Sequence, residues 1–143
     1  MKSMNYIKLE FPSRSANEGF ARSAVAAFTL QLDPNLDELG DIRTAVSEAV
    51  TNAIVHAYPD SIGTVWIKAR IRDGDVLEVA VKDKGRGIED VKRAMQPLYT
   101  TGGDDRSGMG FTIMDSFMDS VRVRSKPGAG TAVTMTKRIR SKK

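Results

Sequence analysis

Alternating segments in the later part of the chain constrain its fold most strongly. In residues 64–71, TVWIKARI, apolar side chains alternate with polar or charged ones, a pattern typical of a strand with one buried face. An Asp-Gly turn signal leads into a second alternating segment, VLEVAVKD, at residues 76–83, so the two segments are predicted to form a hairpin. SVRVRS at 120–125 and TAVTMTK at 131–137 repeat this arrangement around the turn sequence KPGAG. Each hairpin has an apolar face that another element must cover.

The earlier part of the chain predicts the helices that provide this cover. Ser15 and Glu18 form a capping-box pattern, and the apolar residues behind it predict a helix over residues 15–32. A second apolar stripe predicts a helix over residues 35–57, and NYIKLEF at 5–11 is typical of a short strand. Helices early and antiparallel strands late favour an α+β fold. We expect a two-layer α/β sandwich in which helices cover one face of a mixed, mostly antiparallel sheet.

Length and composition favour one globular domain over residues 1–143. The chain has no cysteine, which excludes a disulfide framework and a thiolate metal site. It shows neither a secretory leader pattern nor an apolar run of membrane length. We therefore expect a cytoplasmic protein with no membrane partner.

The formal net charge of +4 comes from one end of the chain. The basic tail KRIRSKK, residues 137–143, holds five basic side chains, which leaves a net charge of −1 for the other residues. A near-neutral body with a basic tail is weak support for binding to a phosphate backbone. We therefore interpret the tail as a solvated terminus and expect no direct nucleic-acid partner.

The predicted second helix carries polar residues beside its apolar stripe. Glu48, Asn52 and His56 recur at every fourth position, so they lie on successive turns, about a third of a turn away from the stripe. The amide oxygen of Asn52 suits Mg²⁺, which prefers oxygen ligands and uses few from the protein. Glu48 is placed to act as a general base toward a hydroxyl group or water. His56 is more simply interpreted as a hydrogen-bonded residue at the edge of the core.

The segment KDKGRGI has the composition of a ligand-binding loop. Asp83 ends a predicted strand, and Gly85 and Gly87 follow it. Glycines at alternate positions let the backbone approach a ligand closely, and the carboxylate can accept a hydrogen bond from a flat donor such as an exocyclic amine. An ordinary Asp-Gly turn is the alternative interpretation of the same residues.

A second glycine-containing segment, RSGMGF, precedes a helix predicted over FTIMDSFM, residues 111–118. Gly108 and Gly110 would place free backbone amides at the start of that helix, which is a favourable site for an anion. The Arg106 guanidinium could reach phosphate oxygens from the same segment. A Gly-x-Gly pattern before a helix is a weak signal when it stands alone.

The three motifs occur together in a recognisable order: Glu-x-x-x-Asn on a helix, Asp-x-Gly-x-Gly after a strand and Gly-x-Gly before a helix. Over about residues 8–136 this arrangement resembles the Bergerat-type ATP-binding domain of gyrase-type ATPases, Hsp90-type chaperones, histidine kinases and mismatch-repair proteins. VSEAVTNAIVHAY, QPLYTT and RSGMGFTIMDSFMD further resemble the bacterial anti-sigma serine kinases, with the sporulation anti-sigma-F type as the nearest likeness. The resemblance implies a protein that binds and inhibits a sigma factor. It also implies that the protein uses ATP to phosphorylate a serine of an anti-anti-sigma factor.

The resemblance implies a role for each residue that matches a motif. Glu48 would be the catalytic base for the substrate serine, and Asn52 would hold Mg²⁺. Asp83 would accept the adenine amine of ATP or ADP in a pocket shaped by Gly85 and Gly87.

Further nucleotide contacts would come from the last motif, GAGTAV, which places Thr131 near the adenine. A lid at about residues 96–107 and the start of the following helix would hold the phosphates. The residues implied there are Thr100, Thr101, Arg106, Ser107, Gly108, Met109, Gly110 and Phe111.

The resemblance also implies protein partners. It implies a homodimer joined through the N-terminal layer, and contact between Arg22 and a protein partner, although a solvated surface arginine is the simpler interpretation of Arg22. Two other functions stay open: an anti-sigma kinase of a stress response, and an ATP-gated ATPase clamp without kinase activity. Because neither a transducer segment nor a phosphoacceptor histidine flanks the motifs, we expect a serine kinase instead of a clamp or a sensor histidine kinase.

Overall fold

The computed structural model describes residues 3–95 and 105–140. Its helices and strands are, in chain order, β1 Ser3–Pro12, α1 Ala16–Thr29, α2 Leu36–Thr51, β2 Thr64–Arg72, β3 Val76–Asp83, α3 Val91–Ala94, α4 Asp105–Phe117, β4 Ser120–Lys126 and β5 Gly130–Arg138. A 3₁₀ turn at Leu30–Leu32 extends α1, and a π-helical turn at Asn52–His56 extends α2. Within these described ranges no helix is long and apolar enough to cross a membrane.

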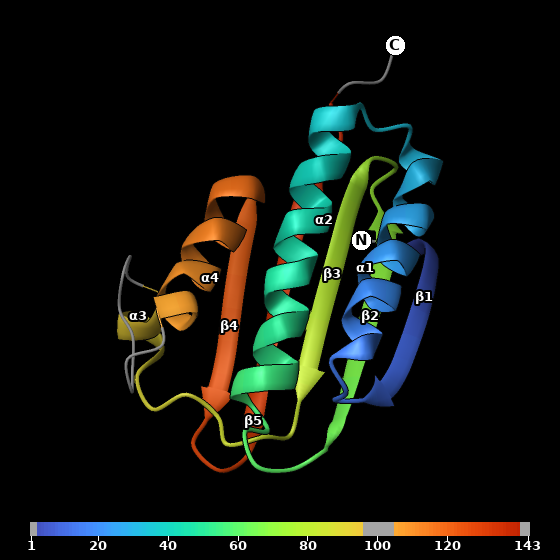
Figure 1. The fold of residues 1–143 in the computed structure, drawn as a ribbon. Helices are drawn as coiled ribbons and strands as arrows, with labels where there is room; N and C mark the ends of the chain where they lie inside the picture. The colour runs from blue at the N-terminus through green and yellow to red at the C-terminus, as the bar shows by residue number, and fades with distance from the viewer. Residues whose placement is uncertain (1–2, 96–104, 141–143) are drawn as a thin grey trace.

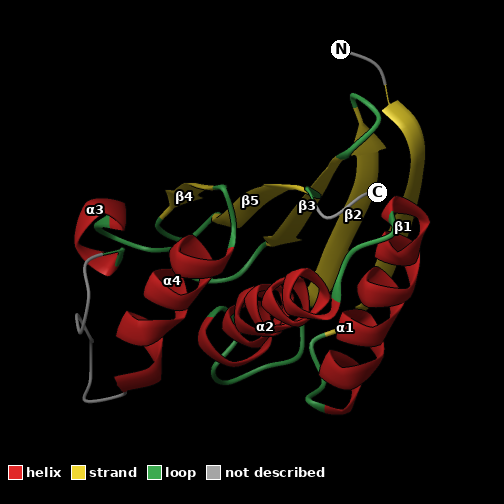
Figure 2. Ribbon diagram, turned by 90° about the horizontal axis from the view of Figure 1, so that it is seen from above, coloured by secondary structure: helices red, strands yellow, loops and turns green. Residues whose placement is uncertain are grey.

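The strands form one five-stranded sheet in the order β1-β2-β3-β5-β4, and each neighbouring pair is antiparallel. Helices α1, α2 and α4 lie on one face of this sheet, with α2 in the middle (Figure 1, Figure 2). No described element covers the opposite face (Figure 2). The predicted two-layer α+β fold is therefore confirmed, except that the sheet is entirely antiparallel and not mixed.

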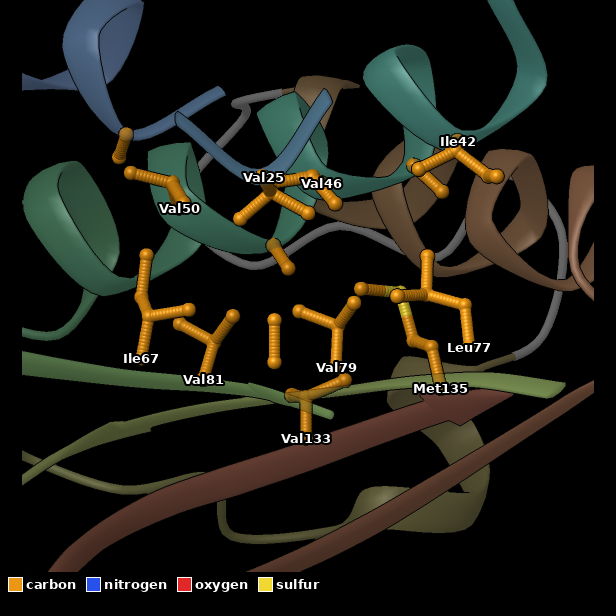
Figure 3. Packing of buried hydrophobic residues seen from close by; sticks show 14 of the residues in the cluster. Val25, Ile42, Val46, Val50, Ile67, Leu77, Val79, Val81, Val133 and Met135 are labelled. Carbon is orange, nitrogen blue, oxygen red and sulfur yellow. The ribbon is translucent and has the colours of Figure 1, made fainter. Parts of the chain in front are cut away.

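The core lies between α2 and the inner face of the sheet (Figure 3). Val46 and Val50 on α2 are fully buried against strand residues such as Val79, which lies in the middle of the sheet. Each such side chain contributes about 1.5–3 kcal/mol through burial. This packing fixes the rotation of α2 and leaves Glu48 and Asn52 half-buried beside the core, where their spacing predicted them.

The predicted capping box at Ser15 and Glu18 is wrong. Ser15 has helical backbone angles (φ −56°, ψ −32°) and makes no side-chain cap hydrogen bond, whereas a capping residue is normally extended. The capping box occurs at α2 instead: the Asn35 side chain accepts from the Glu38 backbone N–H at 2.7 Å, and the Glu38 carboxylate accepts from the Asn35 backbone N–H at 3.1 Å.

The start of α4 also differs from the prediction. The helix begins at Asp105 instead of residue 111, so Gly108 and Gly110 lie inside its first turns and not before them. Glycine lowers helix propensity by about 1 kcal/mol, which tertiary packing can override. At Gly110 the reason is steric, because a Cβ there would lie 3.3 Å from Oε1 of Glu48. The glycine lets α4 approach α2 closely.

Candidate nucleotide-binding site

A cavity of about 330 Å³ lies among α2, α4 and the inner face of the sheet. Five residues that the motifs singled out line it, although they are far apart in sequence: Asn52, Asp83, Gly87, Phe111 and Thr131. His56, expected only at the edge of the core, lines the same cavity. Much of the remaining lining is apolar, which is typical of a site for a flat organic ligand.

Asp83 is the buried acid of this cavity, with only 6% of its surface exposed. Its Oδ1 accepts hydrogen bonds from the backbone N–H of Gly85 at 2.8 Å and of Thr131 at 3.3 Å. Burial raises the pKa of Asp83 above its ordinary value, and the two backbone N–H groups act in the opposite direction. Because both hydrogen bonds go to Oδ1, Oδ2 can accept one from a ligand.

Two glycines after Asp83 allow this loop to pack closely against two other segments, the end of the π-helical turn and the end of β4. A Cβ on Gly85 would lie 2.2 Å from the carbonyl oxygen of Ala57, just beyond the π-helical turn. Gly87 has a positive φ of 76°, and a Cβ there would lie 2.2 Å from the carbonyl oxygen of Lys126 at the end of β4. No other residue type fits either place without moving the backbone, so both glycines predicted to shape the pocket have a steric function.

Gly130 makes the third close approach and was missed as a site residue by sequence reasoning. Its φ is +110°, and an added Cβ would lie 2.2 Å from the carbonyl oxygen of Asp83. The glycines of the turn sequence indicated only a turn. Their pairing opposite the end of β3 follows from strand register, in which Thr131 pairs with Asp83.

Substituting Gly130 by alanine should destabilise the protein by at least about 2 kcal/mol. The reason is the added strain of a side chain at this φ together with the collision against Asp83. Thermal unfolding followed by circular dichroism measures the loss. Gly128→Ala is the matched control, because Gly128 also has a positive φ of 79° but has no neighbour within 4 Å of an added Cβ. Equal losses for the two variants would show that contact with the Asp83 carbonyl is unimportant.

Tyr58 is a second residue that sequence reasoning missed. Its hydroxyl donates to the carbonyl oxygen of Thr64 at 2.8 Å and accepts from the backbone N–H of Lys84 at 2.7 Å. It therefore ties the residue after Asp83 to the start of β2. No local pattern indicates the contact with Lys84, because that residue is 26 positions away and comes near only through the pairing of β2 with β3.

Glu48 and Asn52 lie at the side of the cavity where α4 crosses α2. The position of an added Cβ on Gly110 is 3.3 Å from Oε1 of Glu48 and 3.4 Å from Nδ2 of Asn52. Nδ2 of Asn52 is buried and has no hydrogen-bond partner among the described residues, a state that costs about 1–3 kcal/mol. Asn52 also opens the π-helical turn, a feature often found at functional sites. Because Asn52 also lines the cavity, a ligand there can accept a hydrogen bond from this donor.

Several residues predicted to contact phosphate lie outside the described residues. Thr100 and Thr101, with the lid residues from 96 to 104, lie outside the described residues. Arg106, Ser107, Gly108 and Met109 belong to the first turns of α4, but their side chains also lie outside the described part of the chain. Gly110 and Phe111 are buried in α4, and Phe111 lines the cavity.

Comparison with known proteins gives the family. Residues 11–137 match the family model of the histidine kinase-like ATPase domain. The Anti-sigma F factor of Thermoanaerobacter sp. (strain X514) is 54% identical over 144 residues, which cover 100% of both chains. The Anti-sigma F factor of Caldanaerobacter subterraneus subsp. tengcongensis is 55% identical over 140 residues, 97% of each chain.

Solved structures share the fold at low identity. The RsbU and RsbW domains of a Mycobacterium tuberculosis protein align with a TM-score of 0.70 and 18% identity, over 95% of this chain and 32% of that one. The mycobacterial sensor histidine kinase MprB aligns with a TM-score of 0.60 and 15% identity, over 95% of this chain and 99% of that one. With full-length relatives at this identity and the domain match over residues 11–137, the chain belongs to the anti-sigma F factors, a family built on the histidine kinase-like ATPase domain.

Proposed function

We propose that this protein is an ATP-dependent serine kinase that also binds and inhibits a sigma factor of the sporulation sigma-F type. One observation carries the kinase half of the proposal. The helix carboxylate of Glu48 and the amide of Asn52 adjoin the same cavity that contains the buried acid Asp83. The name of the full-length relatives, Anti-sigma F factor, supports the sigma-binding half.

The purine of ATP or ADP would lie in the cavity against Asp83. Oδ2 would accept the exocyclic amine of adenine, since Oδ1 is already bonded to two backbone N–H groups. The apolar side chains of Val81, Ile88 and Val133 line the same cavity and would contact the ring faces. This combination of one acceptor with apolar walls favours adenine, a flat base with a donor at its edge.

The residues beside the cavity fit a magnesium ion that is shared with phosphates. Mg²⁺ is commonly bound through one or two protein oxygens plus phosphate oxygens and waters. The described residues contain no cluster of three or more His, Cys, Asp or Glu side chains that could hold a metal ion. Asn52 would hold the ion through Oδ1, and its unpaired Nδ2 would meet the polar phosphate group. When bound, the ion would neutralise phosphate charge.

Glu48 would act as the general base for the partner's serine. As the serine oxygen forms a bond to the γ-phosphorus of ATP, the carboxylate would take the hydroxyl proton, and ADP would leave with the electrons of the broken P–O bond. Glu48 is half-buried beside the cavity, where a carboxylate is partly shielded from water.

Helix α1 would supply the partner surface. The Phe20 side chain is 62% exposed, and Arg22, with 36% of its side chain exposed, is held 3.7 Å from Glu18. Aromatic residues and arginine are enriched at protein interfaces, which supports contact of Arg22 with the sigma factor or the anti-anti-sigma factor. The edge strand β1, which precedes α1, has one side unpaired in the sheet and supports a homodimer joined through this layer.

The test is incubation of the protein with γ-labelled ATP and Mg²⁺, with and without a candidate anti-anti-sigma protein. We expect label on a serine of that protein only. Release of inorganic phosphate with no label on the partner would indicate an ATPase clamp instead. A co-purification with a sigma factor in the presence of ATP or ADP tests the sigma-binding half separately.

A further inference from the structure

The uncovered face of the sheet carries an ordered set of side chains. Strand register places three rows of residues on it, each running across β1, β2, β3, β5 and β4. The rows are Tyr6–Arg70–Glu78–Thr136–Ser120, Lys8–Lys68–Ala80–Thr134–Arg122 and Glu10–Trp66–Lys82–Ala132–Arg124. We call these residues the open face. They alternate with the buried or half-buried residues of each strand, so they point away from the nucleotide cavity.

The open face is strongly basic. Its charged members are six basic residues, Lys8, Lys68, Arg70, Lys82, Arg122 and Arg124, and two acidic ones, Glu10 and Glu78. Its formal net charge therefore equals the +4 of the entire chain. The expectation of no nucleic-acid partner rested on the near-neutral sum over the body, and a sum does not report how the charges are distributed.

Both acidic residues of the open face accept hydrogen bonds from neighbouring side chains. Glu78 accepts from Arg70 at 2.9 Å and from Arg72 at 3.1 Å, and Glu10 accepts from the indole N–H of Trp66 at 3.1 Å. The other five basic residues of the open face form no ion pair with a described residue. Their charge is available to an external anion.

The centre of the open face carries small side chains, and basic residues lie on either side of it. Between Lys68 on β2 and Arg122 on β4 lie only the small side chains of Ala80 and Thr134. Three strand spacings separate the two basic residues, which is about 14 Å. An open depression at Ala80 is also lined by Lys8, Lys68, Lys82 and Lys84.

Two aromatic rings lie among these charges. Tyr6 is 55% exposed, and the ammonium groups of Lys8 and Lys68 lie 5.9 and 5.6 Å from the centre of its ring. Trp66 lies four residues from the strand partner of Tyr6, which is about 13 Å along the sheet. Aromatic rings beside a basic track are the features on which single-stranded nucleic acids stack.

This composition favours a nucleic acid over an acidic protein. Although arginine and aromatic residues are common to both kinds of interface, the central area of a protein interface is depleted in lysine and other charged residues and contains apolar anchors. Nucleic-acid interfaces are polar and strongly positive. The open face has lysines and arginines on four of its five strands and only small residues at its centre.

We propose that the open face binds the phosphate backbone of single-stranded nucleic acid, with Tyr6 and Trp66 as stacking positions. The interaction is independent of the proposed kinase reaction, because the open face and the nucleotide cavity lie on opposite sides of the sheet. It is electrostatic in large part, so it weakens steeply as salt is added.

The test uses fluorescence anisotropy of a labelled 20-nucleotide single-stranded DNA of mixed sequence and the full-length protein, between 50 and 200 mM NaCl. The Arg122→Ala/Arg124→Ala variant should bind about tenfold more weakly at 50 mM and lower the slope of log K against log salt by about 1.4. Arg122→Lys/Arg124→Lys should retain binding, since both residue types contact phosphate. Trp66 is the only tryptophan of the chain, so its fluorescence should be quenched when the strand binds.

Two matched pairs control for the loss of charge alone. Arg14→Ala/Arg43→Ala removes two exposed arginines of the helical side, and Lys142→Ala/Lys143→Ala removes two charges of the tail. Each should change affinity less than twofold. Binding that falls equally in either control, unchanged Trp66 fluorescence, equal competition by poly-glutamate, or displacement by ATP would each overturn the proposal. Tighter binding of a duplex of the same length would overturn the stacking positions.

Discussion

Replacement of Glu48 by glutamine should lower the rate of phosphoryl transfer to the partner serine at least about a hundredfold, while the affinity for ATP stays within about twofold. Glutamine keeps the size and the hydrogen-bonding reach of the side chain but cannot take the hydroxyl proton, and general-base catalysis contributes about 10²–10⁴-fold. Glu48 adjoins the cavity without being part of its lining, so the purine should bind as before.

The measurement is single-turnover transfer of label from ATP, with calorimetric titration of ATP as the companion. Asp37→Asn is the control, because Asp37 is an exposed acid in the first turn of the same helix and should leave transfer unchanged. A Glu48→Gln variant that transfers phosphate at the normal rate contradicts the role of Glu48 as base. Equal loss in the Asp37 variant would indicate a general effect of charge on α2.

Replacement of Asp83 by asparagine should weaken ATP binding about 10- to 100-fold, without loss of stability. The introduced amide would keep an oxygen to accept from Gly85 and Thr131, but it would place an NH₂ group where Oδ2 now is. Two donors would then face each other, the side-chain amide and the adenine amine, and loss of a hydrogen bond to a charged group costs about 1.5–3 kcal/mol.

The thermal stability of the Asp83→Asn variant shows whether a loss of ATP affinity comes from the lost ligand contact or from a damaged fold. Burial raises the pKa of Asp83 in the folded state, so the ionised group costs stability at neutral pH, and that cost disappears as the pH falls below the folded-state pKa. Asp83→Asn should therefore unfold at an equal or higher temperature than the unchanged protein at pH 7. Thermal unfolding and ATP titration are both needed. A fall in stability together with affinity would show that Asp83 acts through the fold and not through the ligand.

Much of the fold could be predicted because its local patterns agree with its packing. The alternation in β2 and β3 and the stripe of α2 each have one apolar side, so hydrophobic burial decides which side faces inward. The same stripe placed Glu48 and Asn52 beside the core. Asp83 was singled out because its Asp-x-Gly-x-Gly segment occurs in order with the two other motifs; taken alone, the segment fits an ordinary turn.

The other features depend on contacts between distant residues. The steric function of Gly130 comes from its approach to Asp83, and the linking function of Tyr58 depends on its hydrogen bond from Lys84, 26 residues away. No local spacing encodes either contact. The false capping box at Ser15 shows a related limit, because residue types alone do not determine whether the backbone before a helix is extended.

The distribution of charge over the surface is the feature that the sequence analysis missed most clearly. The tail looked like the origin of the positive charge because charge was summed along the chain. In the folded protein Lys68 and Arg122, which are far apart in sequence, lie in one row across the sheet. Alternation along each strand predicts that these residues face away from the core, but the strand order that sets them side by side across the two hairpins comes from the fold.

The direct test of the adenine pocket is a comparison of ATP with inosine triphosphate, in which a carbonyl oxygen replaces the 6-amine. Calorimetric titration should show that the unchanged protein prefers ATP, because Oδ2 of Asp83 accepts from the amine and repels the carbonyl oxygen. The Asp83→Asn variant should lose or reverse that preference, because its amide can donate to the carbonyl oxygen. If both proteins discriminate between the two nucleotides by the same factor, Asp83 does not contact the purine edge, and the assignment of the cavity is wrong.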